Sequence, residues 1–340
     1  MNKNQFNLAV VGATGTVGNQ ILACLNERKF PLKSLKLLAS QQSAGKKICF
    51  EGELINVEKL TKDSFKGVDI AFFSAGSDVS KKFIPFAGQN GCIVIDNSNA
   101  FRMDPDVPLV VPEVNSYSIT NYSKKGIISN PNCSTIQMVV PLYPIHKKFK
   151  IKRIVVSTYQ AVSGTGKKAI NELLNQVQAI TSFCNYKVNV YPHRIAFNCL
   201  PHIDIFLSNS YTREEMKIVN ETKKIFGDDT IKITATAVRI PVFHGHSESV
   251  NIETYESFSI PEIRALIQKS PGVKLVDNPE KKLYPLAINA AGDDLVLVGR
   301  IRRDESISNG INMWVVADNV RKGAATNAVQ IAEILIKKYI

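Results

Sequence analysis

The stretch that decides the fold is Gly12-Ala13-Thr14-Gly15-Thr16-Val17-Gly18. It follows the continuous apolar run Leu8–Val11, which is typical of a buried parallel strand. Val17, Ile21 and Leu25 then recur at four-residue spacing, which marks one face of a helix. Glycine lets the backbone approach a pyrophosphate, and the N-terminus of the helix offers N–H donors to that anion.

The spacing in this turn is G-x-x-G-x-x-G, a variant of the usual dinucleotide fingerprint. A plain tight turn between a strand and a helix is the alternative interpretation. In its strand-turn-helix context the pattern favours cofactor binding by the turn, namely by Gly12, Thr14, Gly15, Thr16 and Val17.

Further apolar runs, each typical of a buried strand, follow in the first third of the chain at Leu35–Ala39, Val68–Phe73 and Cys92–Ile95. Strand, glycine turn, helix and strand in this order predict a Rossmann-type, doubly wound parallel sheet, which is an α/β fold. We expect this dinucleotide-binding domain to cover residues 1–132.

The pattern of polar and apolar residues changes after about residue 132, where longer β-rich segments alternate the two kinds. Such alternation is typical of a sheet with one wet face, so a second, α+β domain is expected over residues 133–318. Thr212 and Ser259 each stand three residues before a glutamate, the spacing of a capping box at a helix start. The stretch from about residue 320 to 340 reads as one uninterrupted helix, and we expect residues 319–340 to return to the first domain. The β-rich segments are Ile154–Tyr159, Ile231–Ile240, Ser249–Tyr255, Leu295–Ile301 and Ile311–Ala317.

Composition narrows the class of protein. The chain has 340 residues, 44% of them hydrophobic and 21% charged, which suits about two globular domains and excludes a mostly disordered chain. No apolar run approaches the roughly 20 residues that cross a bilayer, and the start shows no signal-peptide pattern. Six cysteines stand singly, which argues against a disulfide scaffold or a zinc ribbon. The expectation is a soluble, cytoplasmic protein without a membrane partner.

A formal net charge of +12 raises the question of nucleic acid. The lysines are dispersed in twos, however, with no long basic block and no interleaved aromatic residues. A solvated, lysine-rich surface explains the charge better than a nucleic-acid partner does.

The loop after the second predicted strand bears on which cofactor is bound. NAD sites usually place a carboxylate there, which accepts from the ribose hydroxyl. This chain has Ser40, Gln41, Gln42 and Ser43 instead, with Lys46 nearby. Hydroxyl groups and a lysine suit a 2′-phosphate, so Ser40, Gln42 and Ser43 are candidate NADP residues.

Cys133 has flanks that no other cysteine shares. Pro131 disfavours helix at Asn130, and Asn132 is a good N-cap, so Cys133 would lie in the first turn of a helix that Pro141 ends or kinks. The positive end of a helix favours a thiolate, which predicts a nucleophile; a small buried hydrophobe is the alternative. Core packing is the expectation for the other cysteines with apolar flanks, Cys24, Cys49, Cys92 and Cys199.

A thiolate nucleophile calls for a histidine as general acid or base. His246 follows Pro241 and Gly245, which predicts a loop position suited to a site, whereas His146 stands among lysines and is expected to be exposed. His244 and His246 share a strand face, but no third ligand accompanies them, so no metal is expected.

With these motifs in order, the chain resembles the bacterial-type aspartate-semialdehyde dehydrogenases over nearly its whole length. Besides the glycine turn, the resemblance rests on the segments 96–103 (DNSNAFRM), 130–135 (NPNCST), 159–164 (YQAVSG) and 239–248. A glycine turn alone is shared by many folds, whereas five such pieces in one order are specific.

The resemblance implies a role for each matching residue. Cys133 would carry a thioacyl intermediate, His246 would be the acid/base, and Gln160 would orient the substrate beside the thiol. Arg239 would hold the substrate carboxylate. The remaining implied residues are Arg102, Asn132, Glu214 and Lys217 for the phosphate and amino ends of the substrate, and Ser163, Gly164 and Asn319 for the cofactor.

The implied reaction is the reversible, NADP-dependent reductive dephosphorylation of L-aspartyl 4-phosphate to L-aspartate 4-semialdehyde. It would serve biosynthesis of lysine, methionine, threonine and diaminopimelate, in a homodimer or a homotetramer. Without the resemblance, a solvated, salt-bridged helix face is the preferred interpretation of Glu214, Lys217 and Glu221. Gln42 stands where relatives commonly carry arginine, which weakens the expected preference for NADP over NAD.

Three other functions compete with this one. An N-acetyl-glutamyl-phosphate reductase shares the opening βαβ pattern and a cysteine nucleophile, but it should not need Glu214. A catalytically silent NADP-binding protein would keep the glycine turn and leave Cys133 inert. A nucleic-acid binder would require salt-sensitive retention of RNA.

Overall fold

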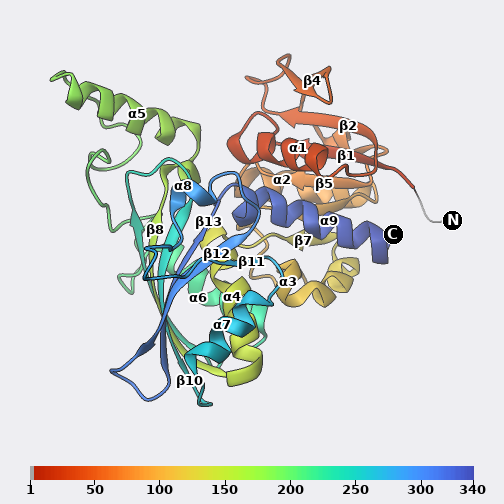
Figure 1. Ribbon diagram of the computed structural model, residues 1–340. Helices are drawn as coiled ribbons and strands as arrows, with labels where there is room; N and C mark the ends of the chain where they lie inside the picture. Colours follow the sequence, from red (N-terminus) through yellow and green to blue (C-terminus); the bar gives the residue numbers. More distant parts are fainter. Residues whose placement is uncertain (1–3) are drawn as a thin grey trace. The chain divides into compact units, whose positions relative to one another are not determined.

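The predicted first strand, β1 (Phe6–Val11), lies inside a seven-stranded sheet in the computed structural model, which describes residues 4–340 (Figure 1). The strand order is β3-β4-β2-β1-β5-β6-β7, and all neighbours are parallel except β3 and β4. Crossover helices connect the parallel strands, so the expected Rossmann-type, doubly wound sheet is present. The other strands are β2 (Leu32–Ala39), β3 (Lys47–Phe50), β4 (Glu53–Lys59), β5 (Ile70–Phe73), β6 (Ile93–Asp96) and β7 (Ile127–Ser129).

Contacts divide the chain into two units. The first runs up to Asn132 and includes Ala324–Ile340, and the second is Cys133–Gly323. Residues 319–323 therefore lie with the second unit, although they were expected with the last helix. Helical elements of the first unit are α1 (Thr16–Glu27), η1 (Lys62–Phe65), α2 (Ser77–Gln89), α3 (Pro112–Asn115), η2 (Ser116–Lys124) and α9 (Thr326–Lys338).

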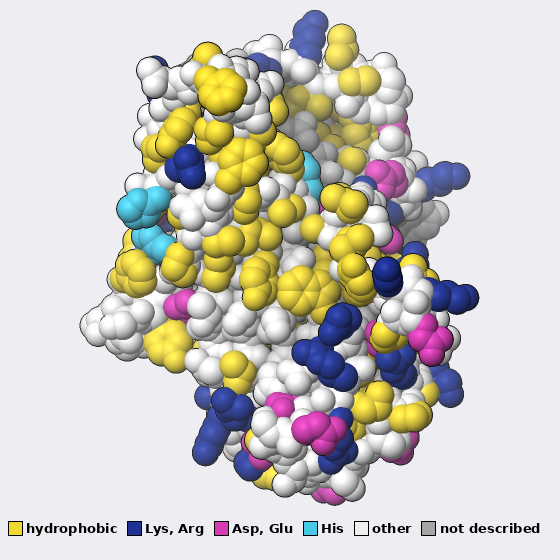
Figure 2. Space-filling model, turned by 60° about the vertical axis from the view of Figure 1, so that its left-hand side comes forward, with side chains coloured by type: hydrophobic (Ala, Val, Ile, Leu, Met, Phe, Trp, Pro, Cys, Tyr) yellow, Lys and Arg dark blue, Asp and Glu magenta, His cyan; other side chains and the backbone are white. Residues whose placement is uncertain are grey.

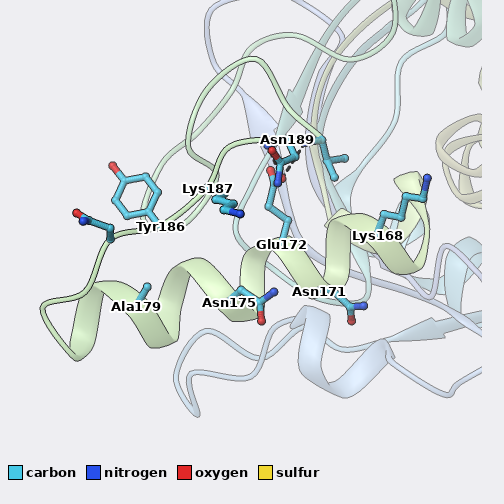
Figure 3. Close-up of a pocket in the computed structure, with 10 residues that line it drawn as sticks. Lys168, Asn171, Glu172, Asn175, Ala179, Tyr186, Lys187 and Asn189 are labelled. Carbon is cyan, nitrogen blue, oxygen red and sulfur yellow. Dashed lines mark hydrogen bonds between the residues drawn. The ribbon is translucent and has the colours of Figure 1, made fainter.

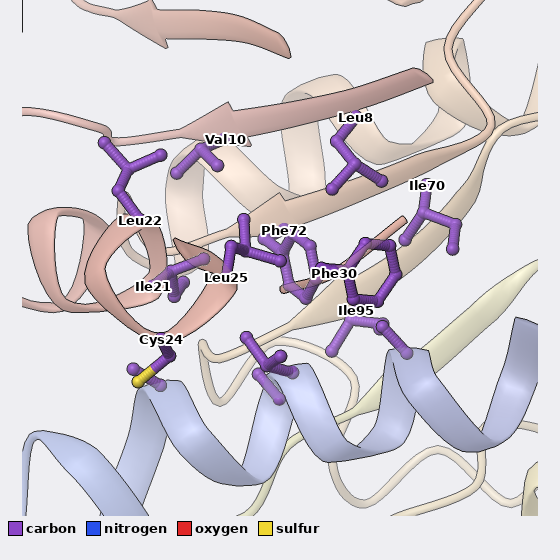
Figure 4. Packing of buried hydrophobic residues seen from close by; sticks show 14 of the residues in the cluster. Leu8, Val10, Ile21, Leu22, Cys24, Leu25, Phe30, Ile70, Phe72 and Ile95 are labelled. Carbon is purple, nitrogen blue, oxygen red and sulfur yellow. The ribbon is translucent and has the colours of Figure 1, made fainter. Parts of the chain in front are cut away.

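A hydrophobic cluster of the first unit lies between its sheet, α1 and α9 (Figure 4), and another includes Phe73 of β5 and Ile84 of α2. Leu8 and Phe72 from the strands meet Ile21 and Leu25 from α1, all of them fully or almost fully buried. Helix α9, at the opposite end of the sequence, runs beside α1. A two-pronged ion pair joins the two helices at 2.7 and 2.8 Å, from Arg28 to Glu333. The last helix thus completes the fold of the first unit.

The stretch from residue 320 is not one uninterrupted helix, as had been expected. A single π-helical turn, Arg321–Ala325, precedes α9. The Asp318 carboxylate accepts from the backbone N–H groups of Val320 and Arg321 at 2.8 and 3.1 Å, which starts this turn before the helix proper.

The second unit is built on a six-stranded mixed sheet with the order β11-β12-β13-β10-β8-β9. Strand β10 pairs antiparallel with both β8 and β13. Helix α4 contacts β8, β10, β12 and β13, so it covers one face of this sheet. Strands of the unit are β8 (Ile151–Gln160), β9 (Lys232–Arg239), β10 (His246–Thr254), β11 (Val273–Leu275), β12 (Val296–Asp304) and β13 (Gly310–Ala317); helices are α4 (Cys133–Phe149), η3 (Val162–Thr165), α5 (Lys167–Thr181), α6 (Arg213–Phe226), α7 (Ile260–Gln268) and α8 (Ala287–Ala290).

The opposite face of this sheet is only partly covered. Val155 and Ser157 are half-buried, and Ser249 is exposed. Tyr159 packs on the half-buried Trp314, with ring centroids 5.4 Å apart. The predicted alternation of wet and dry faces is therefore confirmed for these strands.

Helix boundaries in the second unit follow their local signals, with one exception. Both predicted capping boxes form, at Thr212 before α6 and at Ser259 before α7. Pro141, however, does not end α4, which continues through it and through Pro144 to Phe149. Most residues of α4 are buried, so the packing of the helix outweighs the lost hydrogen bond.

No helix within residues 4–340 is both long enough and apolar enough to span a bilayer.

Candidate active site and dinucleotide site

A cavity of about 410 Å³ opens at the carboxyl ends of the parallel strands of the first unit. Its wall includes the end of β1 and the glycine turn, which is where a doubly wound sheet binds ligands. Gly12, Thr14 and Gly15 line the cavity, while Thr16 begins α1 with Gly15 as its N-cap. The first turn of α1 has no acidic residue, so the helix end keeps its attraction for an anion. The other lining residues are Val11, Ala39, Ser40, Gln41, Lys59, Leu60, Ser74, Ala75, Val79 and Phe83.

Two glycines of this turn have no room for a side chain. Gly12 has φ +84°, and a Cβ there would lie 2.9 Å from the backbone carbon of Ser74. At Gly18 a Cβ would lie 2.2 Å from the carbonyl oxygen of Gly12. The first glycine is therefore required by its backbone angle and the last by close packing of the helix on the turn, as a dinucleotide cradle demands.

The far end of the cavity differs in part from the sequence expectation. Ser40 lines it, together with Gln41 and Lys59, whereas Gln42, Ser43 and Lys46 do not. Lys59 was missed because it ends β4, a short and largely polar strand without an apolar run. It lies in register with Ala39 across the β2–β4 pair, so strand pairing brings it to the cavity. The lining contains no carboxylate, and a lysine there suits a 2′-phosphate.

Cys133 is the first residue of α4, as predicted, and it is partly exposed. The N–H groups of the first helical turn favour the thiolate form of such a cysteine. Gly323 packs against it, because a Cβ at Gly323 would lie 2.8 Å from the Cβ of Cys133. This close approach could not be predicted, since Gly323 stands far along the chain from Cys133 and has no recognisable turn signal.

Gln160 stands at the end of β8 and is almost fully buried. Its Nε2 lies 2.9 Å from the Ser134 hydroxyl, next to the cysteine in the chain, and 3.3 Å from Oε1 of Glu214. The amide therefore connects the start of α4 with the carboxylate of α6.

Glu214 is buried and forms an ion pair with the partly buried Lys217, so this helix face is not a fully solvated surface. The Lys217 ammonium is 3.1 Å from Glu214 and 2.9 Å from Asp204, and Glu214 is only 5% exposed. Burial alone would lower the pKa of Lys217, but the two carboxylates raise it above its usual value. The ammonium is therefore held charged, with acidic neighbours in place. Asp204 is the partner that sequence reasoning missed.

Arg239 and His246 meet at the ends of β9 and β10. Nη1 of Arg239 donates to the carbonyl oxygen of Ala161 at 2.7 Å, and the N–H of Ala161 donates to Nδ1 of His246 at 3.0 Å. A Cβ on Gly164 would lie 3.0 Å from Nη1 of Arg239 and 3.3 Å from Nε2 of His246. The guanidinium and the imidazole thus both border Gly164.

The predicted loop position of His246 is wrong, because the residue begins β10 and is completely buried. Burial, together with the nearby charge of Arg239, holds the pKa of His246 well below its usual 6.5. Since Nδ1 accepts from the Ala161 amide, the proton of the neutral ring is on Nε2. Nε2 makes no hydrogen bond to the described residues, so it can donate to a bound molecule.

The predicted cofactor residues of the second unit also come together. Asn319 Oδ1 accepts from the Ser163 hydroxyl at 3.0 Å and from the Gly245 N–H at 3.1 Å. This amide fixes the segment that leads into His246.

The structure divides the predicted substrate residues between the units. Gln160, Glu214, Lys217 and Arg239 belong to the second unit with Cys133 and His246, while Arg102 and Asn132 belong to the first. Arg102 is 8% exposed and Asn132 is 7% exposed.

Several expectations for other titratable residues need correction. His146 is buried rather than exposed, because Nδ1 accepts from the Ile151 N–H and the ring stacks on Phe226. Cys49 and Cys199 are exposed, so the core packing expected from their short apolar flanks is wrong. Cys92 is buried as predicted, and burial raises the pKa of its thiol to about 12, which keeps it unreactive. In the part of the chain that the structure describes, no cluster of three or more possible metal ligands occurs.

Another cavity, of about 470 Å³, lies in the second unit between α5 and the segment 185–190 (Figure 3). Glu172 points from α5 toward this segment and accepts from the N–H groups of Asn189 and Val190, both at 2.7 Å. The lining of this cavity contains none of the predicted site residues.

Comparison with known proteins agrees with this geometry. Residues 7–122 match the family model of the semialdehyde dehydrogenase NAD-binding domain, and residues 142–322 match its dimerisation domain. An aspartate-semialdehyde dehydrogenase of Aquifex aeolicus is 56% identical over 338 residues, which cover 98% of each chain. The chain belongs to the aspartate-semialdehyde dehydrogenase family. The predicted resemblance, fold class and oxidoreductase function are thereby confirmed.

Solved structures of this family extend the agreement. The Vibrio cholerae aspartate-semialdehyde dehydrogenase II, solved in complex with ASA, is 48% identical, covers 99% of this chain and 100% of its own, and has a TM-score of 0.97. A Candida albicans aspartate-semialdehyde dehydrogenase, solved with NADP, is 26% identical with a TM-score of 0.76 and covers 97% of this chain and 98% of its own. The NADP expectation is therefore in keeping with the family.

Proposed function

We propose that the chain interconverts L-aspartyl 4-phosphate and L-aspartate 4-semialdehyde, with phosphate and NADP, through a thioacyl intermediate on Cys133. The observation that carries this proposal is the convergence, around the start of α4, of a helix-terminal cysteine with a buried amide and the buried Glu214 carboxylate, which is paired with Lys217. In this proposal the first unit binds the dinucleotide, and the second unit supplies the nucleophile and the dimer interface.

Covalent capture is the task of Cys133. Its thiolate attacks the acyl carbon of aspartyl phosphate, the C–S bond forms, and phosphate leaves with the electron pair of the broken C–O bond. Arg102 and Lys217 would bind the phosphate as it leaves, because guanidinium and ammonium groups stabilise its growing negative charge. NADPH, when bound, supplies the hydride that reduces the thioester.

His246 acts as a donor in this scheme. The neutral imidazole carries its proton on Nε2, so it can donate to the substrate oxygen as negative charge develops there. Collapse of the resulting tetrahedral thiohemiacetal anion expels the Cys133 thiolate and yields the aldehyde, which balances the charge without a further proton. In the reverse direction the same donor stabilises the same anion.

Substrate recognition uses the buried charges. Arg239 would hold the α-carboxylate, and the Glu214 carboxylate would accept from the α-ammonium group. Gln160 lies beside both Ser134 and Glu214 and would orient the substrate chain toward the sulfur. An N-acetylated substrate has no ammonium group for Glu214, so this pair favours aspartyl phosphate over N-acetyl-glutamyl phosphate.

The dinucleotide cavity fits NADP on its own residues. Gly12, Gly15 and the N-terminus of α1 would hold the pyrophosphate, and Ser40 with Lys59 would hold the 2′-phosphate. We infer weaker roles for Gln42 and Ser43, which belong to the same turn, since the Ser43 N–H donates to the Ser40 carbonyl at 2.9 Å.

The partly covered face of the second sheet would join two copies of the chain. Tyr159 and Trp314 lie on it, and this unit matches a dimerisation domain. In the view of Figure 2, hydrophobic side chains gather on the surface that faces the reader. We propose a homodimer, which a mass measurement in solution separates from a tetramer. A cytoplasmic location is part of the proposal, since none of the six cysteines, all of which lie within residues 4–340, forms a disulfide.

The deciding assay follows absorbance of reduced cofactor with aspartate semialdehyde, phosphate and either NADP or NAD. We expect phosphate-dependent turnover with NADP, and none with N-acetyl-glutamate semialdehyde in place of the substrate. Cys133→Ser should abolish turnover and leave NADPH binding by fluorescence titration unchanged, because the cofactor cavity is lined by residues of the first unit. Substantial turnover in that variant would refute the thioacyl mechanism.

A further inference from the structure

Two backbone carbonyl groups hold the guanidinium of Arg102. Its Nε donates to the carbonyl oxygen of Asn130 at 2.9 Å, and its Nη2 donates to the carbonyl oxygen of Asn97 at 2.7 Å. These two nitrogens share one edge of the planar group, so the pair of bonds fixes both its plane and its direction. The orientation of Arg102 therefore depends on where residues 97 and 130 are held.

Asn130 is fixed through its backbone and through both atoms of its amide. Its N–H donates to the Asp96 carbonyl at 2.8 Å, and its Nδ2 donates to Oδ1 of Asn97 at 2.7 Å and to the Ala324 carbonyl at 3.1 Å. Its Oδ1 accepts from Nδ2 of Asn327 at 2.6 Å. The residue is 1% exposed, so each lost bond would leave a buried polar group unpaired.

Asn327 supplies the last of these bonds from α9. Its Nδ2 uses both hydrogens, one to Asn130 and one to the Val110 carbonyl at 3.0 Å. The side chain is fully buried beside Ala328 and Val329, which belong to the hydrophobic core. An apolar residue would pack equally well at this position, so we attribute the presence of an amide to its hydrogen bonds.

We propose that Asn327 is a positioning residue for the phosphate site, acting through Asn130 and Asn97 on Arg102. Asn97, Asn130 and Asn327 are called the asparagine relay below. The proposal rests on the proposed function, which assigns Arg102 to phosphate. An arginine that is already oriented loses little freedom when it binds, so a loosened relay weakens phosphate binding and leaves the dinucleotide cavity intact.

The test measures KM for inorganic phosphate and for NADP in aspartate-semialdehyde oxidation. Asn327→Asp replaces the donor by an acceptor and should raise KM for phosphate about tenfold, with KM for NADP within about twofold of wild type. Thr326→Val is the matched control, since Thr326 is the buried neighbour on α9 and its hydroxyl contacts the Cys24 thiol at 3.4 Å. It should leave both constants unchanged.

A double-mutant cycle with Arg102→Ala separates positioning from a general loss of structure. If Asn327 acts through Arg102, adding Asn327→Asp to Arg102→Ala raises KM for phosphate no further. Additive effects, or an unchanged KM for phosphate in Asn327→Asp, would overturn the relay. Absence of phosphate-dependent turnover in the wild type would instead overturn the proposed function.

Should Asn327→Asp fail to fold, Asn97→Ala takes its place in the cycle. Asn97 is only half-buried, and this change removes the acceptor for Asn130 while keeping the carbonyl that holds Arg102. The same non-additivity is expected, and additivity would again count against the relay.

Discussion

A backbone amide decides where the proton of His246 lies. The Ala161 N–H occupies Nδ1, so protonating this nitrogen would set two donors against each other inside a fully buried site. The imidazole therefore works as a neutral donor, which is consistent with its lowered pKa.

This arrangement predicts how stability depends on pH. The pKa of His246 is lowered in the folded state, so below the unfolded value of about 6.5 the unfolded chain takes up a proton that the folded protein does not. The free energy of unfolding is therefore unaffected by this residue above that pH and falls as the pH drops below it. Between pH 6.5 and pH 5 the wild type should lose up to about 1.4 kcal/mol per pH unit through this residue. His246→Gln cannot take up the proton and should show a correspondingly shallower loss in urea unfolding. Equal slopes in the two proteins would contradict the assignment.

Lys59 and Lys46 offer a matched pair for the cofactor site. Lys59 lines the dinucleotide cavity and Lys46 does not, although both are surface lysines near the same turn. Lys59→Gln should raise KM for NADP at least several-fold and leave KM for NAD nearly unchanged, because only NADP carries the 2′-phosphate. Lys46→Gln should change neither constant, as measured by initial rates at low ionic strength. The reverse pattern would restore the interpretation drawn from the sequence.

At the scale of elements, the π-helical turn Arg321–Ala325 brings Gly323 against the start of α4. An added methyl group at this position would lie 2.8 Å from the Cβ of Cys133, so the helix start or the turn must shift. Gly323→Ala should therefore lower kcat by about tenfold or more, since small displacements of a nucleophile are costly.

Gly88 provides the control for that change. It lies within α2, and a Cβ there meets no atom within 4 Å. Gly88→Ala should leave kcat unchanged and stabilise the protein by up to about 0.5 kcal/mol, because alanine favours the helix and Gly88 lies in its last turn. Thermal unfolding and steady-state rates of both variants check the pair, and an unaffected kcat in Gly323→Ala would refute the close approach.

Which elements the sequence could predict depended on how strong their local signals are. Buried parallel strands such as β1 and β5 are unbroken apolar runs, and the capping boxes before α6 and α7 are specific. β4 has a mostly exposed, polar pattern, so Lys59 could not be placed. The predicted helix end at Pro141 is wrong, because helix signals do not report how completely tertiary packing encloses α4.

The site residues show the same limit. Cys133 was predictable from its own flanks, and the glycine turn from its strand and helix. Arg239, Gln160 and Glu214 are predicted only by the family resemblance. Gln160 and Arg239 are brought together by pairing of strands far apart in sequence, and Glu214 reaches Gln160 from helix α6. His246 was mistaken for a loop residue, since Gly245 lies directly before the first residue of β10.

At the scale of the whole molecule, the proposed dimer depends on the partly covered face of the second sheet. Trp314→Glu would place an unpaired charge in that interface and should shift the mass in light scattering from dimer toward monomer. Tyr117→Glu alters a more exposed aromatic residue, 66% accessible, in the first unit and should keep the dimer mass. A dimer mass for Trp314→Glu would place the interface elsewhere.

The closing of the first unit by α9 has a consequence for synthesis on the ribosome. Its sheet and α1 emerge well before α9, the helix that covers Ile21 and Leu25. Until α9 has been translated, that hydrophobic surface stays uncovered, and the nascent chain must be shielded from its neighbours. Premature termination before Ala324 would thus yield an insoluble product even though every strand has been translated.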